Sequence, residues 1–116
     1  MGNKKEKGLE GEEIAARFLK ANGYRILERN YRTKYGEIDI VAQKKKGIIF
    51  VEVKTRLSDK FGCPAEAVDE RKLSRIASVA NQYIQKKRLD DFSFSFEVVS
   101  VTKQNNSWHC EIIPVD

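Results

Sequence analysis

Hydrophobic residues along this chain follow two different periods, and the changes of period divide it into helices and strands. Apolar residues recur at helical spacing from about Lys5 to Asn22 and from about Asp69 to Lys87. Elsewhere they alternate with polar residues or form short β-branched runs, which predicts strands over 24–31, 35–42, 48–54, 92–101 and 108–113. The resulting order, α-β-β-β-α-β-β, predicts an α/β fold with a mixed central sheet flanked by helices.

The segments 35–42 and 48–54 are separated by a lysine-rich turn and are expected to form a hairpin. Because side chains alternate along a strand, Glu52 and Lys54 share one face with Ile48 and Phe50. Both faces of 48–54 are apolar over most of their length, which is typical of a strand covered on both sides. Burying two charges costs free energy unless they are paired, metal-bound or placed at the mouth of a cleft. Glu52 and Lys54 are therefore candidate functional residues.

Asp39 interrupts the preceding strand in the same way. Alternation predicts two faces for this strand, one with Glu37, Asp39 and Val41 and the other with Ile38, Ile40 and Ala42. If the hairpin turns about residues 45 and 46, Val41 lies opposite Phe50 and Asp39 opposite Glu52. Directly opposed residues have Cβ atoms about 5 Å apart. Two carboxylates at that distance repel one another unless a cation lies between them, and a divalent metal suits such oxygen ligands.

This set of side chains has a use in phosphodiester hydrolysis. A metal polarises the phosphoryl oxygen and activates the attacking water, and a nearby lysine stabilises developing negative charge. There is also an ordinary structural alternative, in which Glu52 and Lys54 form an exposed pair on an edge strand and Asp39 is a surface residue near a turn. The spacing alone does not choose between the two interpretations.

Composition narrows the class of protein. At 116 residues the chain is expected to form one domain, 1–116, and its net charge of +5 favours a polyanionic partner, nucleic acid first. The sequence lacks an apolar stretch long enough for a membrane span and an apolar core of a secretory signal, so a cytoplasmic location without membrane association is expected. A single histidine, His109, excludes histidine-rich zinc sites, and Cys63 and Cys110 are expected to be free thiols.

The central motifs resemble those of a known group of proteins. The run Gly36-Glu37-Ile38-Asp39-Ile40-Val41-Ala42, followed by Phe50-Val51-Glu52-Val53-Lys54-Thr55-Arg56, resembles the core of the PD-(D/E)XK nuclease superfamily. It is more similar still to the YraN-like family, a bacterial group related in fold to archaeal Holliday-junction resolvases. The likeness extends to Gly8, Gly11-Glu12, Ala15, Gly23-Tyr24, Arg29-Asn30-Tyr31-Arg32, Phe61-Gly62 and Lys72. It implies a restriction-endonuclease-like fold, with Ile38 standing where the superfamily's name has proline.

The resemblance implies a role for each matching residue. Asp39 and Glu52 would be ligands of Mg²⁺ (magnesium), for which Mn²⁺ can substitute, and the backbone carbonyl of Val53 would be a third ligand. Lys54 would position the attacking water or stabilise the transition state. Glu12 would complete the acidic cluster from the first helix. By pattern alone Glu10 and Glu13 compete with Glu12, and only the family match selects it.

Four further cations have two open interpretations. Arg56 and Lys72 would contact phosphates near the cleft or would be solvated surface cations. Arg29 and Arg32 would contact nucleic acid or take part in packing at the end of a strand.

Three functions follow for the whole chain. The leading one is a Mg²⁺-dependent endonuclease that hydrolyses phosphodiester bonds in DNA, with branched or structured DNA as a natural substrate class. The alternative is a non-catalytic nucleic-acid-binding adaptor that retains the nuclease fold. A third is docking on another protein through the basic surface. A resolvase acting on four-way junctions needs two active sites and hence a homodimer, and substrate specificity is expected in loops such as Leu57 to Pro64.

Overall fold

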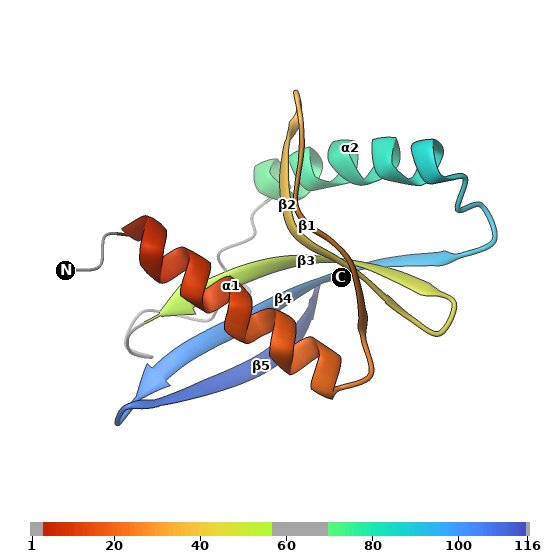
Figure 1. Cartoon of the computed structure of the whole chain (residues 1–116). Coiled ribbons are helices and arrows are strands. Elements are labelled where there is room, and N and C mark those ends of the chain that lie inside the picture. The colour runs from red at the N-terminus through yellow and green to blue at the C-terminus, as the bar shows by residue number, and fades with distance from the viewer. Residues whose placement is uncertain (1–3, 57–69, 116) are drawn as a thin grey trace.

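The computed structural model describes residues 4–56 and 70–115, and its elements follow the predicted order (Figure 1). They are α1 (Lys4–Ala21), β1 (Arg25–Thr33), β2 (Gly36–Lys44), β3 (Gly47–Arg56), α2 (Glu70–Lys87), β4 (Ser93–Gln104) and β5 (Ser107–Val115). The predicted α/β class and element order are confirmed, and the arrangement is consistent with a restriction-endonuclease-like fold. The expected loop at Leu57 to Pro64, with Phe61, Gly62 and Cys63, lies outside the described residues.

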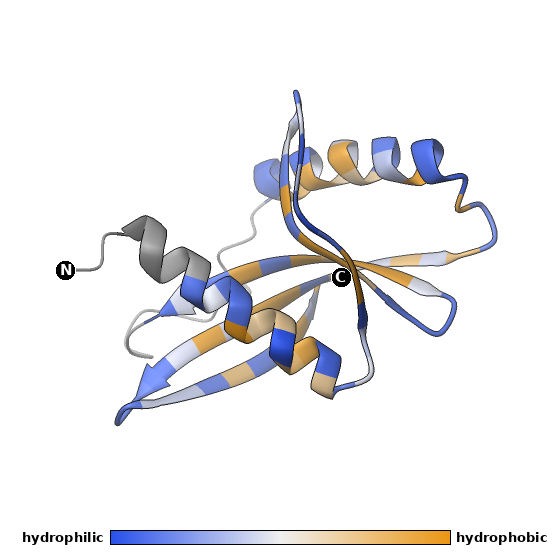
Figure 2. Cartoon of the chain, in the orientation of Figure 1, coloured by the Kyte–Doolittle hydropathy of each residue, from blue (hydrophilic) through white to orange (hydrophobic). Residues whose placement is uncertain are grey.

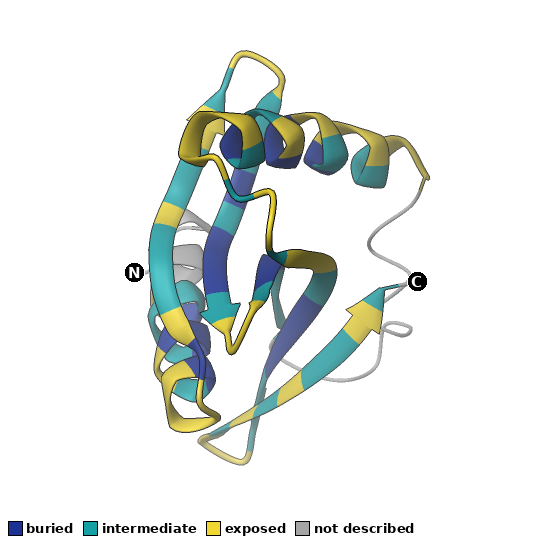
Figure 3. Cartoon of the chain, turned by 90° about the vertical axis from the view of Figure 1, so that its right-hand side faces the viewer, coloured by how far each residue is buried: buried dark blue, intermediate teal, exposed yellow. Residues whose placement is uncertain are grey.

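The five strands form one mixed sheet in the order β1-β2-β3-β4-β5. Strands β3 and β4 are parallel and are connected through α2, whereas the other neighbouring pairs are antiparallel. A parallel pair needs a crossover connection, which explains why the second helix stands between these two strands in the sequence. The two helices cover opposite faces of the sheet, and buried residues concentrate between them (Figures 1 and 3).

Helix α1 lies close to the sheet because small residues face it. Ala15, Ala16 and Leu19 are buried against Ile40 and Val51 and their neighbours on the central strands. The helix ends as the sequence predicts, at Asn22-Gly23: Gly23 has a φ of +88°, and the amide of Tyr24 donates to the carbonyl of Leu19 at 3.0 Å. A left-handed glycine after the last turn is the usual way to end a helix.

Helix α2 packs its apolar stripe on the other face of the sheet (Figure 2). Ile76, Val79, Ala80 and Tyr83 are its buried residues. The Tyr83 ring meets the ring of Phe50 edge-on, with centroids 6.1 Å apart, in the arrangement that aromatic pairs prefer. In the ranges 4–56 and 70–115, no helix has both the length and the hydrophobicity needed to cross a membrane.

Candidate metal centre

The two central strands part at Asp39. Over the described residues of β2 and β3, the ladder runs from Lys44–Gly47 to Ile40–Val51, and it includes the predicted pair of Val41 with Phe50. The predicted register is therefore confirmed, but the ladder ends before Asp39 and Glu52, the next positions in it, so these two residues do not form a ladder pair. Instead, Oδ2 of Asp39 accepts a hydrogen bond of 2.8 Å from the Val53 amide. The side chain takes the place of a backbone acceptor, which places the carboxylate between the diverging strands.

The alternation of side chains along β2 breaks at the same residue. Ile38 packs on the α2 side of the sheet with Val41, whereas Ile40 packs on the α1 side. The prediction that Ile38 and Ile40 share a face is therefore wrong. The physical reason is a bend: Figure 1 shows the β1–β2 hairpin curving away from the other strands toward α2. A bend between the two isoleucines changes the face that each one presents.

Asn30 lies at this bend on strand β1. It stands between the pairs Arg29–Ile40 and Tyr31–Ile38, which places it across from Asp39, and its φ is +54°. Asparagine tolerates the left-handed region better than most residues do. In the orientation that satisfies its hydrogen bonds, the Asn30 amide nitrogen lies 2.9 Å from Glu37 Oε1 and 3.2 Å from Glu12 Oε2. One amide thus bridges a carboxylate on α1 and a carboxylate on β2.

Three carboxylates converge next to this bridge. Oxygen atoms of Glu12, Glu37 and Asp39 all lie within 4.8 Å of one another. The structure therefore brings together two of the predicted residues, Glu12 and Asp39. The third member, Glu37, was not selected from the sequence, although alternation had placed it on the same face as Asp39. Asn30 was also missed as a site residue, and its only signal was membership of the Arg29-Asn30-Tyr31-Arg32 motif.

Gly11 determines how closely Glu12 approaches the strands. A Cβ atom at Gly11 would overlap Oγ1 of Thr55 and would lie 3.0 Å from the Thr55 Cβ. The helix backbone therefore touches β3 at this point, one residue before Glu12. Glycine in a helix costs about 1 kcal/mol relative to alanine, so its presence here is explained by the close contact.

The environment of Asp39 favours its protonated form. Burial raises the pKa of Asp39, and the negative charges of Glu52, Glu12 and Glu37 raise it further, whereas the hydrogen bond from the Val53 amide lowers it; the net pKa is about 7. A carboxyl group normally titrates near 3.9. Glu37 pairs with Arg32 and Glu52 with Lys72, and a further cation next to Asp39 would stabilise its charged form.

Glu52 and Lys54 lie beside this cluster on β3, on the face of the sheet that carries Phe50. Glu52 is largely buried, with 15% of its side chain exposed, and its Oε1 forms an ion pair of 2.5 Å with Lys72 Nζ of α2. Among the described residues, the group of three converging carboxylates does not include Glu52. Lys54 is half-buried, two residues further along the strand.

The remaining predicted cations have different surroundings. Arg29 pairs with Glu13 of α1 at 2.7 Å, and Arg32 pairs with Glu37 at 3.2 Å. Lys72 forms an ion pair with Glu52, and Arg56 is half-buried at the end of β3. The ion pair of Arg29 joins β1 to α1, and the ion pair of Arg32 joins β1 to Glu37 of the acidic cluster. Their contact with nucleic acid stays a prediction. Cys110 is a free thiol, as expected.

The donor set fits a hard divalent cation. Carboxylate oxygens are the ligands that Mg²⁺ and Ca²⁺ prefer, at about 2.0–2.6 Å, so ligands on opposite sides of one ion are about 4–5 Å apart. The spread of 4.8 Å within the cluster matches that span. Glu12, Glu37 and Asp39 could therefore hold one ion, with Glu52 next to it. The absence of histidine and cysteine from this described cluster disfavours zinc.

The fold and the site define a class of protein. It is a small α/β protein with a mixed sheet between two helices and an acidic cluster where the central strands part. The chain belongs to the uncharacterised protein family UPF0102, whose sequence model matches residues 11–101. This confirms the resemblance to the YraN-like family. A UPF0102 protein of Fusobacterium nucleatum is 45% identical over 111 residues, covering 96% of this chain and 93% of the relative. One from Alkaliphilus metalliredigens is 50% identical over 97 residues, covering 84% and 85%.

Among solved structures, SfsA of Pyrococcus furiosus in complex with Ca²⁺ is similar with a TM-score of 0.37 and 14% identity, covering 97% of this chain and 62% of that chain. A likeness at this level supports no inference about fold or function.

Proposed function

We propose that this protein is a metal-dependent endonuclease of the PD-(D/E)XK superfamily that hydrolyses phosphodiester bonds in DNA, with structured DNA as its substrate class. The observation that carries the proposal is the convergence of Glu12, Glu37 and Asp39 within 4.8 Å, from a helix and a strand. Burial, and after it repulsion from Glu52, Glu12 and Glu37, raises the pKa of Asp39, so an ion bound among these oxygens would relieve an unfavourable arrangement.

Mg²⁺ is the proposed ion, with Mn²⁺ as a substitute. When bound, such an ion polarises a phosphoryl oxygen and lowers the pKa of a water molecule. Asp39, Glu12 and Glu37 would hold it, and Glu52 and the Val53 carbonyl remain proposed ligands. Because Glu52 is paired with Lys72, its use as a ligand requires that ion pair to open.

Lys54 supplies positive charge from the neighbouring strand. Its stem starts from the same face of β3 as Glu52, so its ammonium group reaches the side of the sheet on which Glu52 lies. An ammonium group there donates hydrogen bonds to a phosphate oxygen or orients the attacking water. The ion pair between Arg29 and Glu13 fixes α1 against β1, and the hydrogen bonds from Asn30 fix the carboxylates of Glu12 and Glu37 in position while the substrate binds.

The second candidate is a nucleic-acid-binding adaptor that keeps the fold without the chemistry. The ion pair between Lys72 and Glu52 favours it, because a cation of the protein itself already neutralises one of the proposed ligands. An adaptor of this kind binds nucleic acid with the same affinity in Mg²⁺ and in EDTA.

The two candidates are distinguished by incubating the purified protein with labelled single-stranded, duplex, flap and four-way-junction DNA in Mg²⁺, Mn²⁺ or EDTA. Asp39→Asn and Glu52→Gln remove one charge each at nearly constant shape, and Asp90→Asn is the matched control at an exposed position outside the cluster. The nuclease predicts metal-dependent cleavage that the first two variants lose and the control keeps. DNA binding without cleavage, unchanged in all variants, would instead establish the adaptor.

A further inference from the structure

The α2-side face of the sheet is apolar toward one end of strands β3, β4 and β5 and polar toward the other end. The pairings of β3 with β4 and of β4 with β5 define successive rows across the sheet. One row is apolar and contains Phe50, Phe96 and Val115. The next row on this face is mixed and contains Glu52, Val98 and Ile113. The two rows after it are entirely polar and contain Lys54, Ser100, Glu111, Arg56, Thr102 and His109. These six residues are called the polar shelf below.

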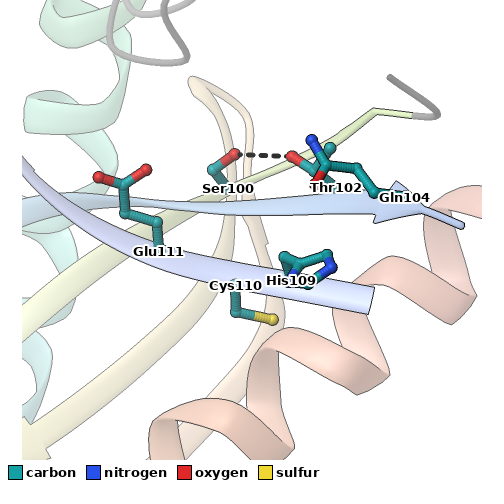
Figure 4. Close-up of a pocket in the computed structure, with 6 residues that line it drawn as sticks. All are labelled: Ser100, Thr102, Gln104, His109, Cys110 and Glu111. Atoms are coloured by element: carbon teal, nitrogen blue, oxygen red, sulfur yellow. Dashed lines mark hydrogen bonds between the residues drawn. The ribbon is translucent and has the colours of Figure 1, made fainter. Parts of the chain in front are cut away.

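The polar shelf is concave where β4 and β5 meet. A concavity of about 390 Å³ is lined there by residues of these two strands (Figure 4). Figure 4 shows Ser100, Thr102 and Glu111 on one side of the strands, whereas the sulfur of Cys110 points to the other side. Ser100 is 4% exposed, and its Oγ lies 3.4 Å from Oγ1 of Thr102. The floor of the concavity is therefore made of hydroxyl groups.

The β5 edge of the shelf is accessible to solvent. Among the described residues, the apolar cluster under α2 extends to Phe50 on β3 and Phe96 on β4, before the polar rows begin. His109 and Glu111 on β5 are exposed. A polar sheet face can simply be solvated, but this one is hollowed and continuous with Lys54 of the proposed catalytic set.

Charge is distributed unevenly across the shelf. Both fixed cations, Lys54 and Arg56, come from β3, next to the candidate metal centre. The groups on β4 and β5 are hydroxyls, an imidazole and the Glu111 carboxylate, which can donate to or accept from the edges of bases. Phosphates would be repelled by Glu111 and attracted by the β3 side. A nucleic-acid strand lying here has its backbone over β3 and a base over β5.

We propose that the polar shelf binds one unpaired nucleotide next to the phosphate that reaches the metal centre. The nucleotide is taken to be unpaired because in a duplex the Watson–Crick edge of the base is occupied by its partner, and a stacked, paired base cannot enter a concavity of this size. A volume of about 390 Å³ is at the lower end of the range for small-ligand sites, which suits a single nucleoside rather than a duplex. The inference rests on the proposed nuclease function and specifies its substrate: DNA with an unpaired nucleotide at the cleavage point.

The test compares the double variant His109→Ala/Thr102→Val with the wild type. Neither substitution removes a lysine or an arginine, the residues that supply the general attraction to phosphates. Lys20→Ala, an exposed position on α1, shows the effect of losing one surface cation away from the shelf. Fluorescence anisotropy in Ca²⁺ measures the affinity for a labelled fully paired duplex and for a forked duplex with unpaired nucleotides. Melting curves establish that the variants fold as the wild type does.

The double variant is expected to bind the forked DNA about tenfold more weakly, because two hydrogen bonds are lost, and to bind the paired duplex as the wild type does. Lys20→Ala is expected to weaken binding of both DNAs equally. If His109→Ala/Thr102→Val binds forked DNA as the wild type does, the shelf inference is wrong. If the wild type nevertheless cleaves DNA, the nuclease proposal stands without the shelf. If the double variant loses fork binding but the wild type does not cleave DNA, the nuclease proposal is wrong and the shelf is a binding site only.

Discussion

Replacing Asp39 with asparagine is expected to stabilise the metal-free protein at neutral and alkaline pH, although it removes a proposed metal ligand. The amide is nearly the same shape as the carboxyl group, and its oxygen can still accept the hydrogen bond from the Val53 amide. What the substitution removes is a negative charge that burial, Glu52, Glu12 and Glu37 all disfavour.

The magnitude follows from the pKa. Folding raises the pKa of Asp39 from 3.8 to about 7. Each unit corresponds to about 1.4 kcal/mol, so the full shift sets an upper limit of about 4 kcal/mol. Salt and movement of neighbouring carboxylates reduce this repulsion, and we expect Asp39→Asn to raise the free energy of unfolding by about 2–4 kcal/mol at pH 8.

The pH dependence has a definite sign. A group whose pKa is raised by folding contributes stability that is fully present below its unfolded pKa and is lost as the pH rises through its folded pKa. The advantage of Asp39→Asn is therefore near zero at pH 4 and reaches its full size above pH 7. Urea unfolding followed by circular dichroism in EDTA at both pH values measures it, with Asp90→Asn as the exposed control. A variant that is less stable than the wild type at pH 8, or whose advantage is the same at both pH values, would refute this reasoning.

Three further substitutions test other contacts around the site. Gly11→Ala is expected to destabilise the protein by about 1–2 kcal/mol through its overlap with Thr55, and Thr55→Ala should restore part of the loss in urea unfolding. Asn30→Gly keeps the left-handed backbone but loses the bridge to Glu12 and Glu37, so calorimetry should find Mn²⁺ binding weakened about tenfold with little change in stability; unchanged affinity would contradict the bridge. Lys72→Met frees Glu52, and we expect lower metal-free stability but a larger gain in melting temperature on adding Mn²⁺; equal gains in variant and wild type would show that Lys72 and the metal do not compete.

Much of the fold follows from local patterns in the sequence. The helical stripe of α2 and the alternation of β3 depend only on neighbouring residues, so both were predictable, as was the register that pairs Val41 with Phe50. The family motifs also pointed to Glu12 and Asp39, which the structure brings together. The roles of Asp39, Glu52 and Lys54 in chemistry stay predictions.

The details of the site depend on features that periodicity does not contain. The bend at Asn30 breaks the alternation of β2 and moves Ile38 to the other face, and a left-handed residue inside a strand leaves no periodic signal. The ion pair between Glu52 and Lys72 joins a strand and a helix that are separated by residues outside the described chain. Such contacts are set by tertiary packing, which a pattern of apolar and polar residues does not specify.

The most direct test of the nuclease proposal is the single-turnover cleavage rate of a labelled forked DNA in Mg²⁺, measured for the wild type and for Asp39→Asn at saturating protein. Saturation removes differences in DNA affinity, so the ratio of rates reports the chemical step. We predict a fall of roughly a thousandfold in the variant, the usual scale for losing a group that stabilises the transition state, and no cleavage by either protein in EDTA. Equal rates in the two proteins, or a wild type that binds the fork and leaves it intact in Mg²⁺ and Mn²⁺, would contradict a catalytic metal centre at Asp39.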